Sequence, residues 1–222
     1  MGKEYIRTVD VRSLANVPGR IIIFDNFGIG KAFVSNYTGA DGRVEITQSL
    51  RYNSQATCRI KTRVTSPAAD DQASLTYYAN ITPQKQLQLD LDFYLESLEN
   101  ARSFEFWLTY LDGTYIHYAK IRFDSQNSKW QYLNSAGTWT DIAGSTQLLI
   151  ISGWHHATMV VDFFNDKYVS LSSENASYDL SSFAVQVDDG PAAQYLILQI
   201  LLYSHSTTPP IAYIANVVLS VP

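Results

Sequence analysis

Strict alternation of apolar and polar residues constrains this chain more than any other feature. In the segment QLQLDLDFYLE, residues 86–96, every second residue from Leu87 to Leu95 is apolar, and the residues between them are Gln, Asp, Asp and Tyr. Successive side chains of a strand point to opposite faces, so this period of two predicts a strand with one buried face. The same period predicts further strands at 57–64, 103–110, 114–123, 157–164, 167–171, 194–204 and 211–221. Few segments have the period of a helix.

Turn-forming residues separate these segments. The Asp-Gly pair in LDGT, residues 111–114, suits a two-residue hairpin, and FNDK at 164–167 is a second tight reversal. The Pro-Pro pair at 209–210 cannot continue a strand, and the polar stretch 124–139 is expected to form a short hairpin. Without alternating strand and helix units, the pattern predicts an all-β chain that forms a two-sheet antiparallel β-sandwich. We expect the continuously apolar segment 194–204 in the centre of a sheet, with both faces covered.

Length and composition agree with this fold class. Aromatic residues make up 13% of the 222 residues and charged residues only 17%, which favours strands, because aromatic side chains suit a pleated, half-buried surface. A sandwich of roughly 200 residues is commonly one domain. We therefore expect one β-sandwich domain at 21–222, preceded by an N-terminal arm, residues 1–20, that adds a strand or docks on a neighbour.

Charge and cysteine content exclude several classes of partner. The net charge is −5 and no run of Lys or Arg is present, so we expect no nucleic-acid partner. The longest apolar run near the N-terminus, IIIF, is too short for a signal peptide or a membrane span, and neither is expected. Cys58 is the only cysteine, so no intrachain disulfide can form, and we expect it to be a small buried apolar residue.

Two adjacent histidines, His155 and His156, lie in the predicted strand GWHHATMVVDFF. Neighbouring side chains on a strand point to opposite faces, so the two rings cannot bind one metal ion together. We expect His155 on the face of Ala157 and Met159, and His156 on the opposite face. Both are predicted to be structural or solvent-facing.

Several of these segments resemble the concanavalin A-like, laminin-G-like jelly-roll superfamily. In GWHHATMVVDFFNDKYVSL a Trp-His pair opens a strand, a Val-rich run ends in Asp, and an Asn-containing turn leads into a Tyr-Val strand. IIIFDNF at 21–27 is similar to the opening of such domains, and SFEFWLTYLDGTYIHYAKIRF to their central hairpin. The resemblance implies a concanavalin A-like jelly roll. This superfamily includes lectins, carbohydrate-binding modules, glycoside hydrolases, polysaccharide lyases, adhesion domains and virus-particle proteins, so it does not choose a function.

Catalytic patterns of the superfamily are not matched. Its retaining hydrolases carry a Glu-x-Asp-x-x-Glu run, whereas DLDFYLESLE offers Asp90, Asp92, Glu96 and Glu99 in another order. Its lyases present a Gln-x-His strand and an Arg-rich strand, whereas TYIHYAK lacks the Gln and Glu105 stands where a basic face would be needed. We therefore predict no catalytic residue.

Ligand and metal candidates remain. Sugar rings stack on aromatic side chains while their hydroxyls need donors and acceptors, and core packing is the alternative role for each aromatic residue. The candidate ligand-binding residues are Trp130, Tyr132, Trp139, Tyr115 and Tyr118. The resemblance implies a structural calcium ion as the one cofactor, with Asp25 and Asp162 as its expected ligands and two ordinary strand-end aspartates as the alternative.

The sequence thus favours a non-catalytic interaction module. We expect a structural or adhesive subunit of an extracellular or virus-particle assembly, whose partners are other proteins or copies of itself. A glycan-binding, lectin-like module is the alternative, and a carbohydrate-active enzyme with an unfamiliar carboxylate set is the third hypothesis.

Overall fold

The computed structural model describes residues 20–25, 33–37, 42–53, 55–63, 66, 68–79, 86–96, 98–146, 153–174, 176–205 and 208–222, with the backbone alone for 20–25 and 48. The predicted N-terminal arm, except Arg20, lies outside these residues.

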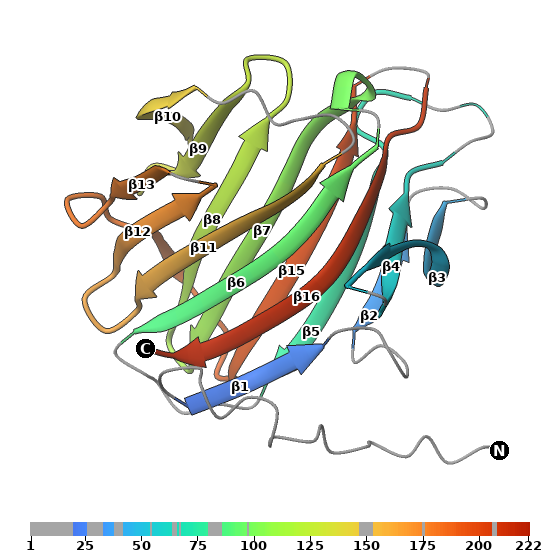
Figure 1. Ribbon diagram of the computed structural model, residues 1–222. Coiled ribbons are helices and arrows are strands. Elements are labelled where there is room, and N and C mark those ends of the chain that lie inside the picture. The colour runs from blue at the N-terminus through green and yellow to red at the C-terminus, as the bar shows by residue number, and fades with distance from the viewer. Residues whose placement is uncertain are drawn as a thin grey trace, which may run out of the picture.

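The described residues form two antiparallel sheets of eight strands each, packed as two layers (Figure 1). The strand order of the first sheet is β13-β12-β11-β6-β16-β4-β3, and β1 also pairs with β16. The order of the second sheet is β10-β9-β8-β7-β15-β5-β2, and β14 also pairs with β8. The fold is thus the predicted all-β, two-sheet antiparallel jelly roll.

The strands of the first sheet are β1 (Arg20–Asp25), β3 (Arg43–Tyr52), β4 (Gln55–Lys61), β6 (Leu87–Leu95), β11 (Trp154–Asp162), β12 (Lys167–Ser173), β13 (Ala176–Asp179) and β16 (Ile211–Val221). The strands of the second are β2 (Val34–Tyr37), β5 (Gln72–Ala79), β7 (Ala101–Asp112), β8 (Tyr115–Asp124), β9 (Lys129–Leu133), β10 (Trp139–Thr146), β14 (Gln186–Asp189) and β15 (Gln194–Ser204). A three-residue 3-10 helix, η2 (Leu98–Asn100), leads from the first sheet into β7. In this part of the chain no helix has the length and apolar character needed to span a membrane.

The alternation that predicts the strands also decides which side chains form the core. Along β6 every second side chain is buried, from Leu87 to Leu95. Phe93 of β6 stacks on Phe104 of β7 with ring centroids 4.7 Å apart, which joins the inner faces of the two sheets. Cys58 of β4 is fully buried in this core, as predicted.

The predicted hairpin turns are confirmed. The LDGT turn joins β7 to β8 and places Gly113 at a φ of 99°, which glycine adopts without the steric cost of a Cβ. The FNDK turn joins β11 to β12, with Asp166 at a φ of 54°. The third, β9–β10, is the short hairpin expected within 124–139.

The central position of β15 is confirmed, because it pairs with β7 on one side and β5 on the other. The expectation that both its faces are covered is wrong. Leu196, Leu198 and Ile200 are buried, but Ile197 and Gln199, which point the other way, are half-exposed. Ile197 therefore belongs to an accessible surface, whereas Leu201 on the same side is 2% exposed.

A side chain of the first sheet closes a gap in the second. On one edge of β8, β14 pairs with residues 115–118 and β9 with residues 121–124, so Lys120 falls between the two ladders. Tyr168 of β12 crosses the core and fills this gap. Its hydroxyl accepts from the Lys120 backbone N–H (3.0 Å) and lies 2.8 Å from the Leu133 carbonyl, to which it donates; the Lys120 carbonyl is 3.2 Å away.

Candidate functional site

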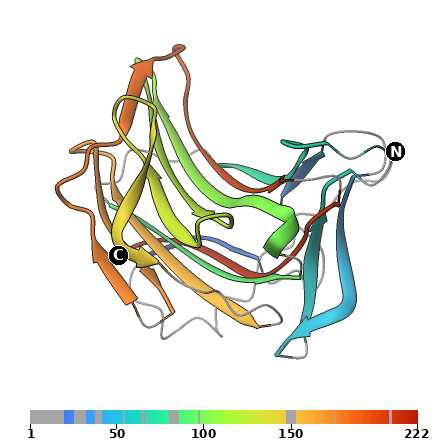
Figure 2. The same ribbon diagram turned by 90° about the horizontal axis from the view of Figure 1, so that it is seen from above.

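The outer face of the second sheet, formed by side chains that point away from the core, holds polar groups that are nevertheless buried. Phe104 and Phe106 of β7 point into the core, so Ser103 and Glu105 point outward, yet they are only 1% and 3% exposed. Strands β7 and β15 are bowed along their length (Figure 2). Side chains crowd together on the inner side of such a curve, which accounts for buried polar groups on an outer face.

Glu105 is the most enclosed charge of this face. Ser103 Oγ donates to its Oε1 at 2.5 Å, Trp107 Nε1 donates to its Oε2 at 2.9 Å, and Arg122 Nη1 lies 3.9 Å from Oε1. Burial raises the pKa of Glu105, and the bonds from Ser103 and Trp107 and the charge of Arg122 partly oppose that rise. Glu105 thus fixes the positions of Trp107 and Arg122.

Lys120 lies opposite Trp107 on the neighbouring strand β8. Its ammonium nitrogen is 3.8 Å from the Trp107 ring centroid and 4.7 Å from that of Tyr118, within the range of cation–π attraction. Burial lowers the pKa of Lys120, while Glu105 and Asp188 act in the opposite direction. The face thus combines aromatic rings with a partly desolvated cation.

A chain of side-chain contacts continues from Arg122 toward the edge of the sheet. Arg122 Nε donates to Gln131 Oε1 at 2.6 Å, and Gln131 Nε2 donates to Asp141 Oδ1 at 2.6 Å. The guanidinium carbon of Arg122 lies 4.4 Å from the ring centroid of Trp139. Arg122 therefore joins the Glu105 cluster to the ring of Trp139.

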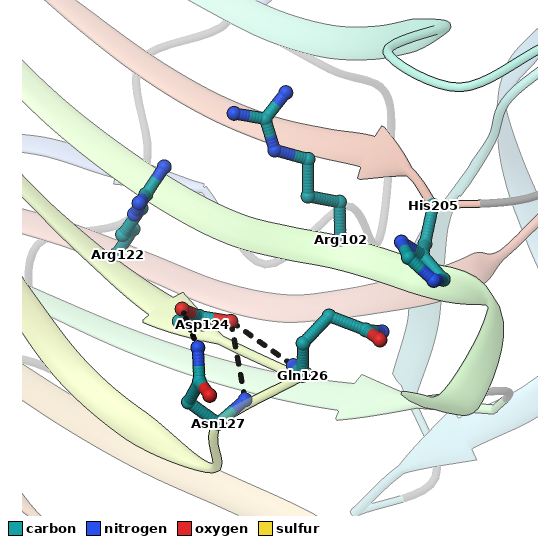
Figure 3. Close-up of a pocket in the computed structure, with 6 residues that line it drawn as sticks. All are labelled: Arg102, Arg122, Asp124, Gln126, Asn127 and His205. Atoms are coloured by element: carbon teal, nitrogen blue, oxygen red, sulfur yellow. Dashed lines mark hydrogen bonds between the residues drawn. The ribbon is translucent and has the colours of Figure 1, made fainter.

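A pocket of about 210 Å³ opens beside Arg122. Arg102, Arg122 and His205 line it together with Asp124, Gln126 and Asn127 of the β8–β9 turn (Figure 3). Asp124 already accepts three hydrogen bonds, from the backbone N–H groups of Gln126 and Asn127 and from Asn127 Nδ2. The groups that remain to meet a ligand here are mainly donors.

The structure separates the five predicted aromatic ligand residues. Trp130 is fully buried and Tyr132 is 6% exposed, and both point into the core, so neither can present a ring to a ligand. Tyr115 is 45% exposed but stands at the end of β8 on its core-facing side. Only Trp139 and Tyr118 lie on the outer face, half-exposed and each beside a cation.

The sequence analysis missed Trp107 and treated Glu105 only as an argument against a basic face. The signal was present, because alternation in SFEFWLTY places Glu105 and Trp107 on the face opposite Phe104 and Phe106. What it lacked was the register of the predicted LDGT hairpin, which places Lys120 opposite Trp107 and Arg122 opposite Glu105.

The predicted calcium ligands are not brought together. Asp25 ends β1 and Asp162 ends β11, and the order β1-β16-β6-β11 separates them by three strand spacings, about 14 Å. Asp162 accepts from the backbone N–H groups of Phe164 and Asn165, which closes the β11–β12 turn. The two residues therefore cannot bind one ion between them. Among described side chains, no group of three or more His, Cys, Asp or Glu has an arrangement that could hold a metal.

The two histidines point to opposite faces, as predicted. His155 is 5% exposed, lies beside Phe93 in the core, and its Nδ1 is 2.6 Å from Glu174 Oε1. His156 is on the outer face of the first sheet, where its Nδ1 is 2.7 Å from Asp92 Oδ1. Thr158 links this pair to Asp90, which Thr158 Oγ1 approaches at 2.7 Å.

Stability should depend on pH through His156. The hydrogen bond to Asp92 is the largest cause that raises the His156 pKa, so the folded chain binds this proton more tightly than the unfolded chain. The contribution is complete below the ordinary histidine pKa of about 6.5 and is lost as pH rises through the raised pKa. His156→Gln should therefore lower the urea midpoint at about pH 5.5 and change it little at about pH 9. Because the side chain is 54% exposed, we expect a loss of no more than about 1 kcal/mol.

The control for this measurement is His205→Gln, which removes an exposed histidine beyond the end of β15. An equal loss at both pH values for His156→Gln would contradict the assignment, because a packing defect does not titrate.

Comparison with known proteins identifies solved structures that have a similar fold. No family model and no curated protein matches the sequence. Among solved structures, the chain is similar to a β-glucanase of Bacillus licheniformis, with a TM-score of 0.52, 11% identity, and coverage of 92% of this chain and 100% of that one. It is also similar to peanut lectin (TM-score 0.55, 9% identity, coverage of 90% and 96%) and to a carbohydrate esterase of the Shiga toxin-encoding bacteriophage phi24B (TM-score 0.54, 11% identity, coverage of 91% and 99%).

At these identities the likeness concerns the fold alone. It agrees with the two antiparallel sheets of the structure. The chain has the concanavalin A-like jelly-roll fold.

Proposed function

We propose that this chain is a non-catalytic interaction module that binds a glycan on the outer face of its second sheet. The observation that carries the proposal is the arrangement of Trp107, Tyr118 and Trp139 among charged and amide side chains on one accessible sheet face. Pyranose rings stack on aromatic faces, and their hydroxyls pair with fixed donors and acceptors. Rings held in place by Glu105, Lys120 and Arg122 suit that combination.

The structural neighbours support a glycan ligand without selecting one. A glucanase, a lectin and a carbohydrate esterase share the fold, and their names refer to carbohydrates or to lectins. A glycan-binding jelly roll is therefore consistent with both the fold and the surface of this chain.

The carboxylates of this face favour binding over hydrolysis. Glycoside hydrolysis uses two carboxyl groups about 5 to 10 Å apart on either side of the scissile bond. Glu105 is almost fully buried and is bonded to Ser103 and Trp107, and Asp124 is bonded to its own turn. Glu105 and Asp124 thus each have a structural role that accounts for their position.

Trp107→Ala tests the proposal. Removing the ring should weaken glycan binding about 10-fold or more, since a buried aromatic contact contributes about 1.5–3 kcal/mol. The matched control is Trp154→Ala, because Trp154 is a half-exposed tryptophan on the outer face of the first sheet. A glycan array with the full chain identifies the ligand, and titration calorimetry then compares the variants.

Equal losses of glycan affinity in Trp107→Ala and Trp154→Ala would contradict the placement of the site.

The second candidate function is that of a structural or adhesive subunit of an extracellular or virus-particle assembly. It is favoured by β2, the last strand in the described order of the second sheet, where Val34 is 61% and Tyr37 40% exposed, because exposed side chains at the end of a sheet suit contact with another chain. A chain that binds no glycan but is an oligomer by light scattering would make this candidate the better one.

A further inference from the structure

We propose that the glycan is acidic, and that the Lys120 ammonium binds the carboxylate of a uronic acid. This inference rests on the proposed function, which it narrows to one class of ligand.

Among the described residues, no side-chain oxygen accepts a hydrogen bond from the N–H groups of the Lys120 ammonium. The ammonium lies over the rings of Trp107 and Tyr118. Glu105 and Asp188 attract it electrostatically without forming an ion pair with it among the described residues. An ammonium carries three N–H donors, and a half-buried one without an oxygen partner is suited to receive one from a ligand.

The position of this ammonium discriminates between neutral and acidic sugars. A neutral sugar that stacks on Trp107 competes with the ammonium for the ring and offers it only hydroxyl groups in return. A uronic acid carries a carboxylate next to its ring. It can replace the cation–π contact with a charge-assisted hydrogen bond while its ring remains near Trp107 and Tyr118.

The pocket beside Arg122 also favours an acidic ligand. Arg122 stands two residues from Lys120 on the same face of β8, so the two cations are roughly 7 Å apart along the strand. Arg122 and Arg102 line the pocket (Figure 3), and its one carboxylate, Asp124, accepts hydrogen bonds from its own turn. Arg102 pairs with Asp70 and Glu105 partly balances Arg122, which leaves Lys120 as the cation without an ion-pair partner. Lys120 and Arg122 thus lie next to each other along the outer face of β8, and Arg102 adds a third cation at the pocket beside Arg122.

The test compares acidic glycans with the same glycans after reduction of their carboxyl groups to alcohols. Polygalacturonate, alginate and hyaluronate, each in both forms, are offered to the full chain. We expect at least one acidic form to bind about 10-fold or more tightly than its reduced form. Lys120→Gln should abolish that preference and Lys120→Arg should keep it. The control Lys167→Gln, which removes an exposed charge from the first sheet, should leave it unchanged. Thermal melts confirm that each variant is folded.

The outcomes separate this inference from the proposed function. Binding of reduced or other neutral glycans as tight as that of the acidic forms would overturn the acidic class and leave glycan binding intact. Binding of no glycan would overturn both. A sulfated glycan that binds as well as the uronates would replace carboxylate recognition by a general attraction of anions. A Lys120→Gln variant that keeps the preference would overturn the role of Lys120.

Discussion

Replacing Trp130 with Ala lowers the free energy of unfolding by about 3–5 kcal/mol, the cost of deleting a fully buried aromatic side chain. The ring packs edge-on against Phe106 at 5.7 Å and Phe123 at 5.2 Å between centroids. Its backbone N–H and carbonyl also bond to Ser145 Oγ, which ties β9 to β10. No side chain nearby can fill the space without leaving its own contacts. Urea denaturation followed by fluorescence or circular dichroism measures the loss.

Trp139→Ala is the matched control, because Trp139 belongs to the same hairpin but lies half-exposed on the outer face. Removing the Trp139 ring should lower the free energy of unfolding by about 1 kcal/mol or less, and it should reduce ligand binding. If the two variants lost equal stability, the assignment of Trp130 to the core and Trp139 to the surface would be wrong.

Tyr168→Phe removes one oxygen atom and should lower the free energy of unfolding by about 2–4 kcal/mol. The hydroxyl serves the Lys120 N–H and the Leu133 carbonyl at the gap between β9 and β14, and each buried group left unsatisfied costs about 1–3 kcal/mol. Burial raises the pKa of Tyr168 far above its ordinary value, so the hydroxyl stays protonated and able to donate. Denaturation measures the stability, and hydrogen exchange at the Lys120 amide reports the lost bond directly.

Tyr132→Phe provides the comparison. Tyr132 is another core tyrosine and its ring contacts that of Tyr168 at 5.6 Å, so the mutation keeps both rings in place. We expect a much smaller loss. Unchanged exchange at Lys120 in Tyr168→Phe would show that the hydroxyl does not close the gap.

Alternation over many residues, which is hard to produce otherwise, predicted most of the long strands, but β3 and β5 were missed. The boundaries of 194–204 and 211–221 coincide with β15 and β16, and 86–96 contains β6. The four-residue strands β2, β13 and β14 were missed, because a period of two cannot be recognised over so few residues. β10 was also hard to recognise, because its pairing with β9 is irregular and its register shifts between Asp141 and Thr146.

The candidate site was less predictable, because it depends on which strands are neighbours. Counting parity along KWQYL shows that Trp130 and Tyr132 share a face, but not that this face is the core. Likewise, the predicted LDGT hairpin makes 103–110 and 114–123 neighbours without showing that Lys120 stands opposite Trp107, and nothing in the chain order indicates that Arg122 reaches Trp139. These contacts depend on the exact pairing register, which the sequence pattern did not determine.

The solitary thiol of Cys58 has a practical consequence. It is the only sulfhydryl of the chain and is fully enclosed between the sheets, so an alkylating reagent can reach it only when the sandwich opens. The rate at which Cys58 of the unmodified protein is alkylated thus reports how often the sandwich opens. Alkylation rates can rank the Trp130 and Tyr168 variants without any added label.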